Sequence, residues 1–175
     1  MIRWAGTELD LVDRPYNTTI LNERAVELAV AFHWLAGRTG SGLEVGNVLG
    51  HYGVSGHRVV DLHEQADGVD NLDVFDVTGT YDWIVAISTI EHVRWDVERD
   101  AEGAAAAVEH LRTLTDNLLV TVPLGWNPPL DAELPLGATR WACYRRTGDT
   151  WQEGDLTPAP YGPAWATAVW VGEWA

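Results

Sequence analysis

The stretch that decides the fold runs from residue 43 to residue 52 and reads LEVGNVLGHY. It predicts a short strand, Leu43 to Val45, that stops at Gly46. In an open α/β sheet, ligands bind beyond the carboxyl ends of the strands, where glycine lets the backbone approach a ligand closely. The dinucleotide fingerprint G-x-G-x-x-G is absent, because Val48 occupies its second glycine position. The stretch therefore indicates either a strand that ends at a ligand site or a tight turn that holds no ligand.

Further short apolar runs and two helical patterns flank this stretch. The apolar runs are continuous rather than alternating, which is typical of parallel strands covered on both faces. We expect strands at residues 43–45, 58–62, 69–74, 83–87 and 118–122, and helices at 19–35 and about 100–114. Residues 140–146 and 166–171 resemble two more strands joined only by loop, which can pair antiparallel. The sequence predicts an α/β, doubly wound Rossmann-like fold, mostly parallel, with an antiparallel edge at the C-terminus.

Length and composition indicate one domain. The 175 residues suit a single domain, in which we expect residues 1–40 to be an N-terminal helical lid or acceptor segment and 41–175 the Rossmann-like core. No apolar run approaches the roughly 20 residues that span a bilayer, and no secretory signal is evident. The single cysteine, Cys143, excludes an internal disulfide. These features favour a cytoplasmic protein without a membrane partner.

The charge balance disfavours nucleic acid as a partner. Asp and Glu total 26 against 11 Lys and Arg, a formal net charge of −15, and no basic run occurs. Affinity for nucleic acid depends on basic side chains that neutralise phosphates.

The tryptophan content is also unusual, since the chain has ten tryptophans. Their rings can bind sugars or cations, or can belong to the core. Six lie in the last third: Trp126, Trp141, Trp151, Trp165, Trp170 and Trp174.

Two polar groups follow predicted strands. Asp61 ends the run at 58–62, and its carboxylate can accept two hydrogen bonds from ribose hydroxyls. The alternative is a solvated loop carboxylate, and Asp61 is preferred to Glu64 because it ends the apolar run. The second group, Ser88 to His92, follows the buried run at 83–87. A lone histidine is more often structural than catalytic, but the end of a buried strand makes His92 a stronger candidate.

Taken together, these motifs resemble those of class I S-adenosylmethionine-dependent methyltransferases. That family usually reads Glu-x-Gly-x-Gly-x-Gly at the first motif. Glu44, Gly46 and Gly50 match, whereas Val48 replaces the middle glycine. The resemblance extends from residue 43 to about residue 123. A closer likeness adds residues 16–19, 22–27 and 88–96, and is to a subgroup of small methyltransferase-like proteins often associated with glycan or cell-surface biosynthesis.

The resemblance implies S-adenosylmethionine as the cofactor and assigns positions around it. Asp61 would hold the ribose, and Asp73, or less favourably Asp76, would lie near the adenine. Ser88 and Thr89 would close the pocket floor. The residues assigned to the methionine side are Glu44, Gly46, Asn47 and Gly50. Val48 narrows the turn, and only 15 positions separate Gly46 from Asp61, so the intervening helix must be short.

Transfer of a methyl group needs mainly orientation of the acceptor, and an oxygen acceptor also needs a base. His92 is the first candidate for that base, Glu91 the second and His51 the third, whereas an amine or thiolate acceptor needs none. The acceptor is expected to be a small molecule or glycan. The residues proposed to contact it are Tyr16, Asn17, Arg24, His51 and Trp126.

Other functions remain as alternatives. A degenerate, non-catalytic methyltransferase-like module would use a Trp-rich surface to bind a partner. A nicotinamide-dependent oxidoreductase is disfavoured by the missing glycine fingerprint. A zinc enzyme is disfavoured because one cysteine and six histidines without H-x-x-x-H spacing offer no usual ligand set, and no metal site is predicted.

Overall fold

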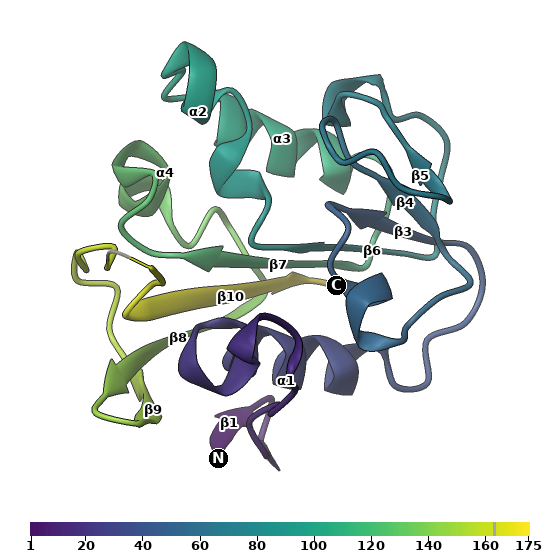
Figure 1. The fold of residues 1–175 in the computed structure, drawn as a ribbon. Coiled ribbons are helices and arrows are strands. Elements are labelled where there is room, and N and C mark those ends of the chain that lie inside the picture. Colours follow the sequence, from purple (N-terminus) through teal and green to yellow (C-terminus); the bar gives the residue numbers. More distant parts are fainter. Residues whose placement is uncertain (163) are drawn as a thin grey trace.

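The computed structural model describes residues 1–162 and 164–175 (Figure 1). An eight-stranded sheet forms its centre, and a two-stranded hairpin lies beside it. The strands are β1 (Ile2–Trp4), β2 (Thr7–Leu9), β3 (Gly42–Val45), β4 (Arg58–Val60), β5 (Val69–Asp70), β6 (Trp83–Ile87), β7 (Leu118–Pro123), β8 (Arg140–Thr147), β9 (Thr150–Gly154) and β10 (Ala168–Trp174). The α-helices are α1 (Arg24–Leu35), α2 (Trp95–Glu98), α3 (Gly103–Arg112) and α4 (Pro128–Glu133). Short 3-10 helices cover Tyr16–Leu21, Leu49–Tyr52, Val74–Asp76 and Ile90–His92.

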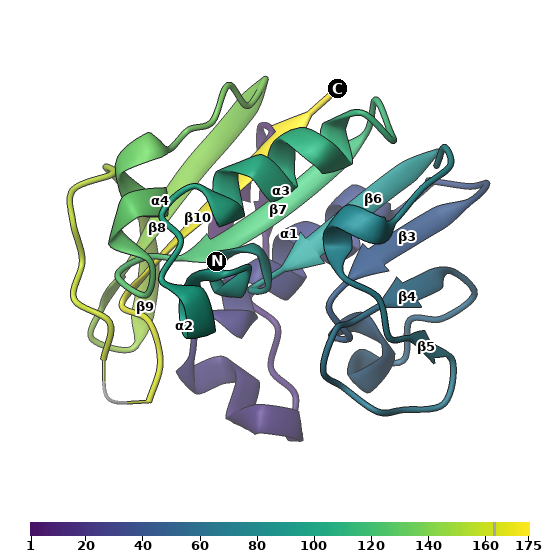
Figure 2. The same cartoon turned by 90° about the horizontal axis from the view of Figure 1, so that it is seen from above.

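The sheet has the strand order β5-β4-β3-β6-β7-β10-β8-β9. Neighbours from β5 to β7 are parallel, whereas β10 is antiparallel to both β7 and β8. Figure 2 shows β4 and β5 at one end of the sheet and β8 and β9 at the other. The chain runs outward from β3 to β4 and β5, and then returns to place β6 on the opposite side of β3. This reversal makes the carboxyl ends of β3 and β6 the switch point at which α/β sheets bind ligands.

Alternating side chains on the central strands build two cores. Ile84 and Ala86 face the layer that contains α3 and α4, while Val85 and Ile87 face α1 and the β1–β2 hairpin. Figure 1 shows these layers on opposite sides of the sheet. Strands covered on both faces need apolar residues at every position, which explains the continuous runs in the sequence. Within residues 1–162 and 164–175, no helix combines the length and apolar composition that a bilayer span requires.

The segment that links β3 to β4 is short. It contains the 3-10 helix Leu49–Tyr52 where a doubly wound fold ordinarily has a longer helix. The residues from 61 to 68, between β4 and β5, contain no helix. The expectation of a short first helix is thus confirmed, and the carboxyl ends of these strands are covered by loops instead.

Several predicted boundaries were wrong for local reasons. The helix expected from residue 19 starts at Arg24, because Asn17 and Thr18 have positive φ angles and the Asn22 side chain accepts a hydrogen bond from the Arg24 N–H at 3.0 Å. The third strand is only Val69–Asp70, since Asp73 caps a 3-10 helix instead of continuing a strand.

The predicted antiparallel edge also needs correction. The runs at 140–146 and 166–171 do pair antiparallel, as β8 and β10. However, the C-terminal strand β10 lies inside the sheet between β7 and β8, and the edge strand is β9. Strand β9 lies in the segment expected to be loop. It forms a tight hairpin with β8, with Thr147 opposite Thr150.

One buried carboxylate ties α1 to the C-terminal strand. Glu173 on β10 is 6% exposed and accepts a hydrogen bond from Trp34 Nε1 at 2.9 Å. Arg38 lies 3.5 Å from the same oxygen, and Arg140 pairs with the other. The contacts of Trp34 and Arg38 with Glu173 join residues more than 100 positions apart, so they hold the end of α1 against the C-terminal strand β10.

Replacing this carboxylate is expected to destabilise the fold. Glu173→Ala leaves the buried Trp34 N–H without an acceptor, and the free energy of unfolding should fall by about 2 kcal/mol. Urea unfolding followed by circular dichroism measures the change. Glu153→Ala, on exposed β9, is the matched control and should change stability by less than about 0.5 kcal/mol. Equal effects of the two substitutions would contradict the anchoring role.

Candidate functional site

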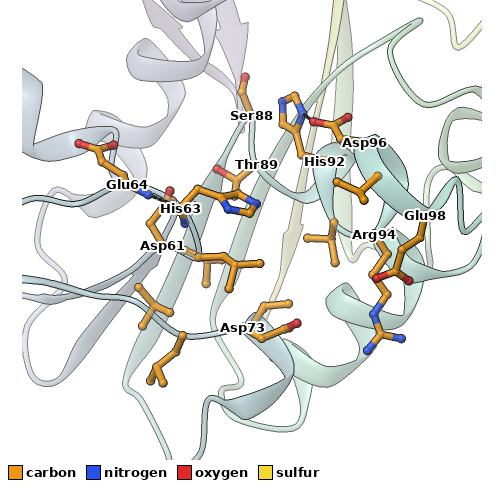
Figure 3. Close-up of a pocket in the computed structure, with 18 residues that line it drawn as sticks. Asp61, His63, Glu64, Asp73, Ser88, Thr89, His92, Arg94, Asp96 and Glu98 are labelled. Carbon is orange, nitrogen blue, oxygen red and sulfur yellow. Dashed lines mark hydrogen bonds and ion pairs between the residues drawn. The ribbon is translucent and has the colours of Figure 1, made fainter.

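A cavity of about 650 Å³ opens at the carboxyl ends of β3, β4 and β6 (Figure 3). Its volume lies within the range of ordinary small-molecule sites. Figure 3 shows Asp61 and Glu64 on one side and His92 with Asp96 on the other. The residues that line it are Val45, Gly46, Val60, Asp61, Leu62, His63, Glu64, Leu72, Asp73, Val74, Ser88, Thr89, His92, Val93, Arg94, Asp96, Val97 and Glu98.

The turn after β3 requires glycine at its first position. Gly46 has a φ of +86°, which favours glycine, and a Cβ there would lie 2.1 Å from Thr89 Oγ1. Gly50 differs, because a Cβ at that position would meet only Asn47 Oδ1, at 3.2 Å. The two glycines of the motif therefore have unequal importance, and Gly46 sets the close approach of β3 to β6.

The buried Glu44 carboxylate fixes this turn through hydrogen bonds to its backbone. It is fully buried, and its Oε1 accepts hydrogen bonds from the N–H groups of Val48 at 2.8 Å and Leu49 at 2.7 Å. Its Oε2 lies 2.8 Å from His57 Nε2. Both oxygens are thus engaged inside the protein. The structure places Glu44 beneath the turn rather than on the cavity wall, where it shapes the backbone around Gly46.

The replacement of the motif's middle glycine by Val48 does not fill the cavity. Val48 has a φ of −107°, a conformation open to any residue, and its side chain packs against the core on the α1 side of the sheet. Val48 does not line the cavity. A second glycine is unnecessary for this turn because the valine side chain points elsewhere.

Asp61 ends β4 at the cavity edge. Its Oδ1 accepts hydrogen bonds from the N–H groups of His63 at 2.8 Å and Glu64 at 2.7 Å, which fold the following loop back. Within residues 1–162 and 164–175, no donor reaches Asp61 Oδ2. One carboxylate oxygen is therefore left for a ligand. Asp73 also lines the cavity and caps its 3-10 helix through the Phe75 N–H at 3.0 Å.

The segment after β6 is strained. Ser88 has a φ of +46°, unusual for a residue with a side chain. Its Oγ donates to Glu27 Oε1 at 2.6 Å, and its N–H donates to Thr121 O at 3.2 Å. Thr89 Oγ1 donates to the Ile87 carbonyl at 3.0 Å. Backbone strain of this kind concentrates at functional sites, where surrounding contacts hold it.

His92 lies between two carboxylates. Its Nδ1 is 2.8 Å from Asp96 Oδ2, and its Nε2 is 3.5 Å from Glu91 Oε1. The Trp126 ring lies 5.2 Å from the imidazole, and Trp126 Nε1 donates to Asp96 Oδ1 at 2.9 Å. The His92 side chain is 44% exposed, whereas Glu91 is buried. His92 thus lines the cavity in front of the buried Glu91 and stays in contact with solvent.

A group of three acids, Glu23, Glu27 and Glu91, surrounds Arg24 behind Ser88 and His92. Burial is the main cause that raises the pKa of Glu91 well above its ordinary value, and the charge of Glu27 adds to it. Burial and then Glu27 raise the pKa of Glu23 to about 7. Arg24 Nη1 lies 3.1 Å from Glu27 Oε2, so the one cation is already paired.

The predicted site residues fall into two groups. Six of them line the cavity: Gly46, Asp61, Asp73, Ser88, Thr89 and His92. The others lie outside its wall: Glu44, Asn47, Gly50, Glu91, Tyr16, Asn17, Arg24, His51 and Trp126. Two of these contact the lining residue Glu64, since Asn47 Nδ2 donates to its Oε1 at 2.7 Å and His51 Nε2 lies 3.6 Å from the same oxygen. Tyr16 stacks on His51, with ring centroids 4.6 Å apart.

Sequence reasoning missed part of the site. Asp96 stands four positions after His92, a helical spacing that identifies it as a partner in retrospect. Glu27 shows no local signal, because its contacts with Ser88 and Thr121 join residues 61 and 94 positions apart. Among the apolar lining residues, Leu62, Leu72 and Val93 lie outside the strands and helices, so no periodic pattern marks them.

The likeness to solved structures supports the fold. No family model and no curated protein matches the chain. The N-methyltransferase NodS from Bradyrhizobium japonicum WM9, in complex with S-adenosyl-L-homocysteine, is 10% identical with a TM-score of 0.56, covering 93% of this chain and 88% of that one. The N-terminal domain of EvdMO1 with S-adenosylhomocysteine bound is 13% identical with a TM-score of 0.50, covering 91% and 84%. The predicted methyltransferase fold is confirmed, and the glycan-associated subgroup stays a prediction.

The unequal importance of the two glycines gives a direct test. Gly46→Ala combines a positive φ with a close contact, so the free energy of unfolding should fall by about 2 kcal/mol. Gly50→Ala is the control and should change it by less than about 0.5 kcal/mol. Urea denaturation measures both. A Gly50→Ala effect as large as that of Gly46→Ala would show that the turn is not held as described.

Proposed function

We propose that this chain is an S-adenosylmethionine-dependent methyltransferase. One observation carries the proposal: a cavity of ligand size lies at the switch point, with the Gly46 turn and the free oxygen of Asp61 on its wall. The fold supports it, since NodS and the EvdMO1 domain share this fold and each holds S-adenosylhomocysteine.

The cavity residues fit the cofactor. Asp61 Oδ2 is an acceptor for the ribose hydroxyls, and Asp73 lies where the adenine is expected. Leu62, Leu72 and Val74 add the apolar surface that a purine ring needs. The Gly46 backbone would lie against the methionine part, while Glu44 acts indirectly, by fixing the turn.

The cofactor supplies a methyl group that its positively charged sulfur makes electrophilic. The protein's task is then to orient the acceptor and manage its protons. His92 is the residue best placed for proton removal from an oxygen acceptor, because it lines the cavity and Asp96 fixes its Nδ1 side. Glu91 lies behind it, 3.5 Å from its Nε2.

The acceptor side is proposed to include Tyr16, Asn17, Arg24, His51 and Trp126, with a small molecule or glycan as acceptor. Trp126 is 38% exposed beside His92 and offers an aromatic face. The alternative of a Trp-rich binding surface is less well supported, because half of the six C-terminal tryptophans are buried: Trp151, Trp170 and Trp174.

Ligand-induced stabilisation tests the proposal. S-adenosylhomocysteine at 100 times its dissociation constant should add about 2.7 kcal/mol of stability and raise the melting temperature. Asp61→Ala should abolish the shift, whereas Asp67→Ala, an exposed acid in the same loop, should leave it intact. Differential scanning fluorimetry with calorimetric titration measures both. An absent shift in the unmodified protein at millimolar ligand would overturn the proposed function.

A further inference from the structure

The wall of the cavity has many more acids than cations. Of the 18 residues that line it, five are acids and one, Arg94, is an arginine. The chain has no lysine, so among these lining residues the other groups that can take up positive charge are His63 and His92. A carboxyl group in contact with water is ionised at neutral pH, whereas an ordinary histidine is mostly neutral there. The five acids are Asp61, Glu64, Asp73, Asp96 and Glu98.

These acids come from two segments on opposite sides of the cavity. Asp61, Glu64 and Asp73 follow β4 and β5 and are half-buried, whereas Asp96 and Glu98 belong to α2 and are exposed. Figure 3 shows Asp61 and Glu64 on one side of the space and Asp96 and Glu98 on the other. A positive charge inside the cavity is therefore attracted from both sides.

Neighbouring arginines do not neutralise the wall. Within residues 1–162 and 164–175, no arginine forms an ion pair with any of the five acids, and the ion pairs of Glu64 and Asp96 are with histidines. The Arg94 guanidinium instead lies over the ring of Phe75, 4.4 Å from its centroid, and Phe75 is not a lining residue. The net charge of −15 adds to the same negative potential.

The two forms of the cofactor differ by one positive charge. The sulfur of S-adenosylmethionine is a cationic sulfonium, and that of S-adenosylhomocysteine is a neutral thioether. The adenine, the ribose and the amino-acid end are the same in both. A negative potential at the sulfur position therefore attracts the methylated form more strongly than the demethylated one.

We propose that this cavity selects its cofactor by charge and binds S-adenosylmethionine more tightly than S-adenosylhomocysteine. The inference rests on the proposed methyltransferase function. Glu64 and Glu98 are the wall acids to which the ribose and adenine assignments give no other task, and here they act through their charge. The discrimination is a property of this acid-lined wall, since the contacts with the rest of the cofactor do not distinguish the two forms.

Charge selection assists product release. During transfer the acceptor forms a bond to the methyl carbon as the carbon–sulfur bond breaks, and the electrons of the broken bond stay on sulfur. The sulfur becomes neutral, while the positive charge passes to the methylated acceptor or leaves it as a proton. The attraction between wall and sulfur thus ends with the reaction, and a new cofactor molecule displaces the product.

Calorimetric titration of both forms at two salt concentrations tests the inference. At roughly 7 Å in water of low ionic strength, one carboxylate attracts a cation by an amount worth about a factor of two in binding. Five acids and one arginine then predict a preference for S-adenosylmethionine of about tenfold, and of at least about threefold, in about 20 mM sodium chloride. The preference should narrow in about 500 mM sodium chloride, because salt screens charges but does not weaken methyl packing.

Removing charge from the wall should reduce the preference. Glu64→Gln and Glu98→Gln together should lower it about fourfold at low salt, with the affinity for S-adenosylhomocysteine nearly unchanged. Glu64→Gln keeps an oxygen that can accept the hydrogen bond from Asn47, and Glu98 is exposed, so both variants should fold. Glu98→Gln alone serves as the test if the double variant does not. Glu153→Gln, on the edge strand β9 at the other end of the sheet from β4 and β5, is the control that keeps the full preference.

The outcomes separate this inference from the proposed function. If both forms bind but the preference at low salt is less than about threefold, or is the same at both salt concentrations, the charge inference is overturned and the methyltransferase function stands. A preference that the double variant retains in full would also overturn it, because the wall charge would then have no part in the discrimination. If neither form binds, the methyltransferase function is contradicted, and the charge inference with it.

Discussion

The carboxylate of Glu44 is the constraint on which the site depends. It is buried, accepts hydrogen bonds from the N–H groups of Val48 and Leu49, and lies against His57. These bonds bend the chain sharply after β3, so that Gly46 can approach β6. A chain with only a 3-10 helix between β3 and β4 has no long helix to define this turn. The buried Glu44 carboxylate fixes the turn instead of a long helix.

This constraint explains how the cavity tolerates a departure from the three-glycine pattern. Once Glu44 fixes the backbone, the Val48 side chain packs into the core on the α1 side and leaves the cavity wall to Gly46, Asp61 and Thr89. The strained Ser88 closes the wall from the β6 side, where Glu27 and Thr121 hold it. The cavity is therefore bounded by buried polar contacts as much as by apolar packing.

The parts of the fold that the sequence predicted are those with a local signal. The continuous apolar runs of β3, β6 and β7 identified buried parallel strands, and strand ends placed Asp61 and Ser88 at the site. Strand β9 was missed because its exposed, polar residues resemble a loop, and it pairs only at the sheet edge. The direction of the Val48 side chain and the role of Glu44 depend on tertiary contacts with no sequence pattern. The role of Glu27 was missed for the same reason, since α1 meets the end of β6 only in the folded chain.

A crystal structure of the protein with S-adenosylhomocysteine tests the account most directly. The account predicts the ligand in the cavity between β3 and β6, with a ribose hydroxyl within hydrogen-bond distance of Asp61 Oδ2. Glu44 should remain bonded to the N–H groups of Val48 and Leu49. A ligand bound elsewhere, or a Glu44 carboxylate turned from the backbone toward the ligand, would contradict it.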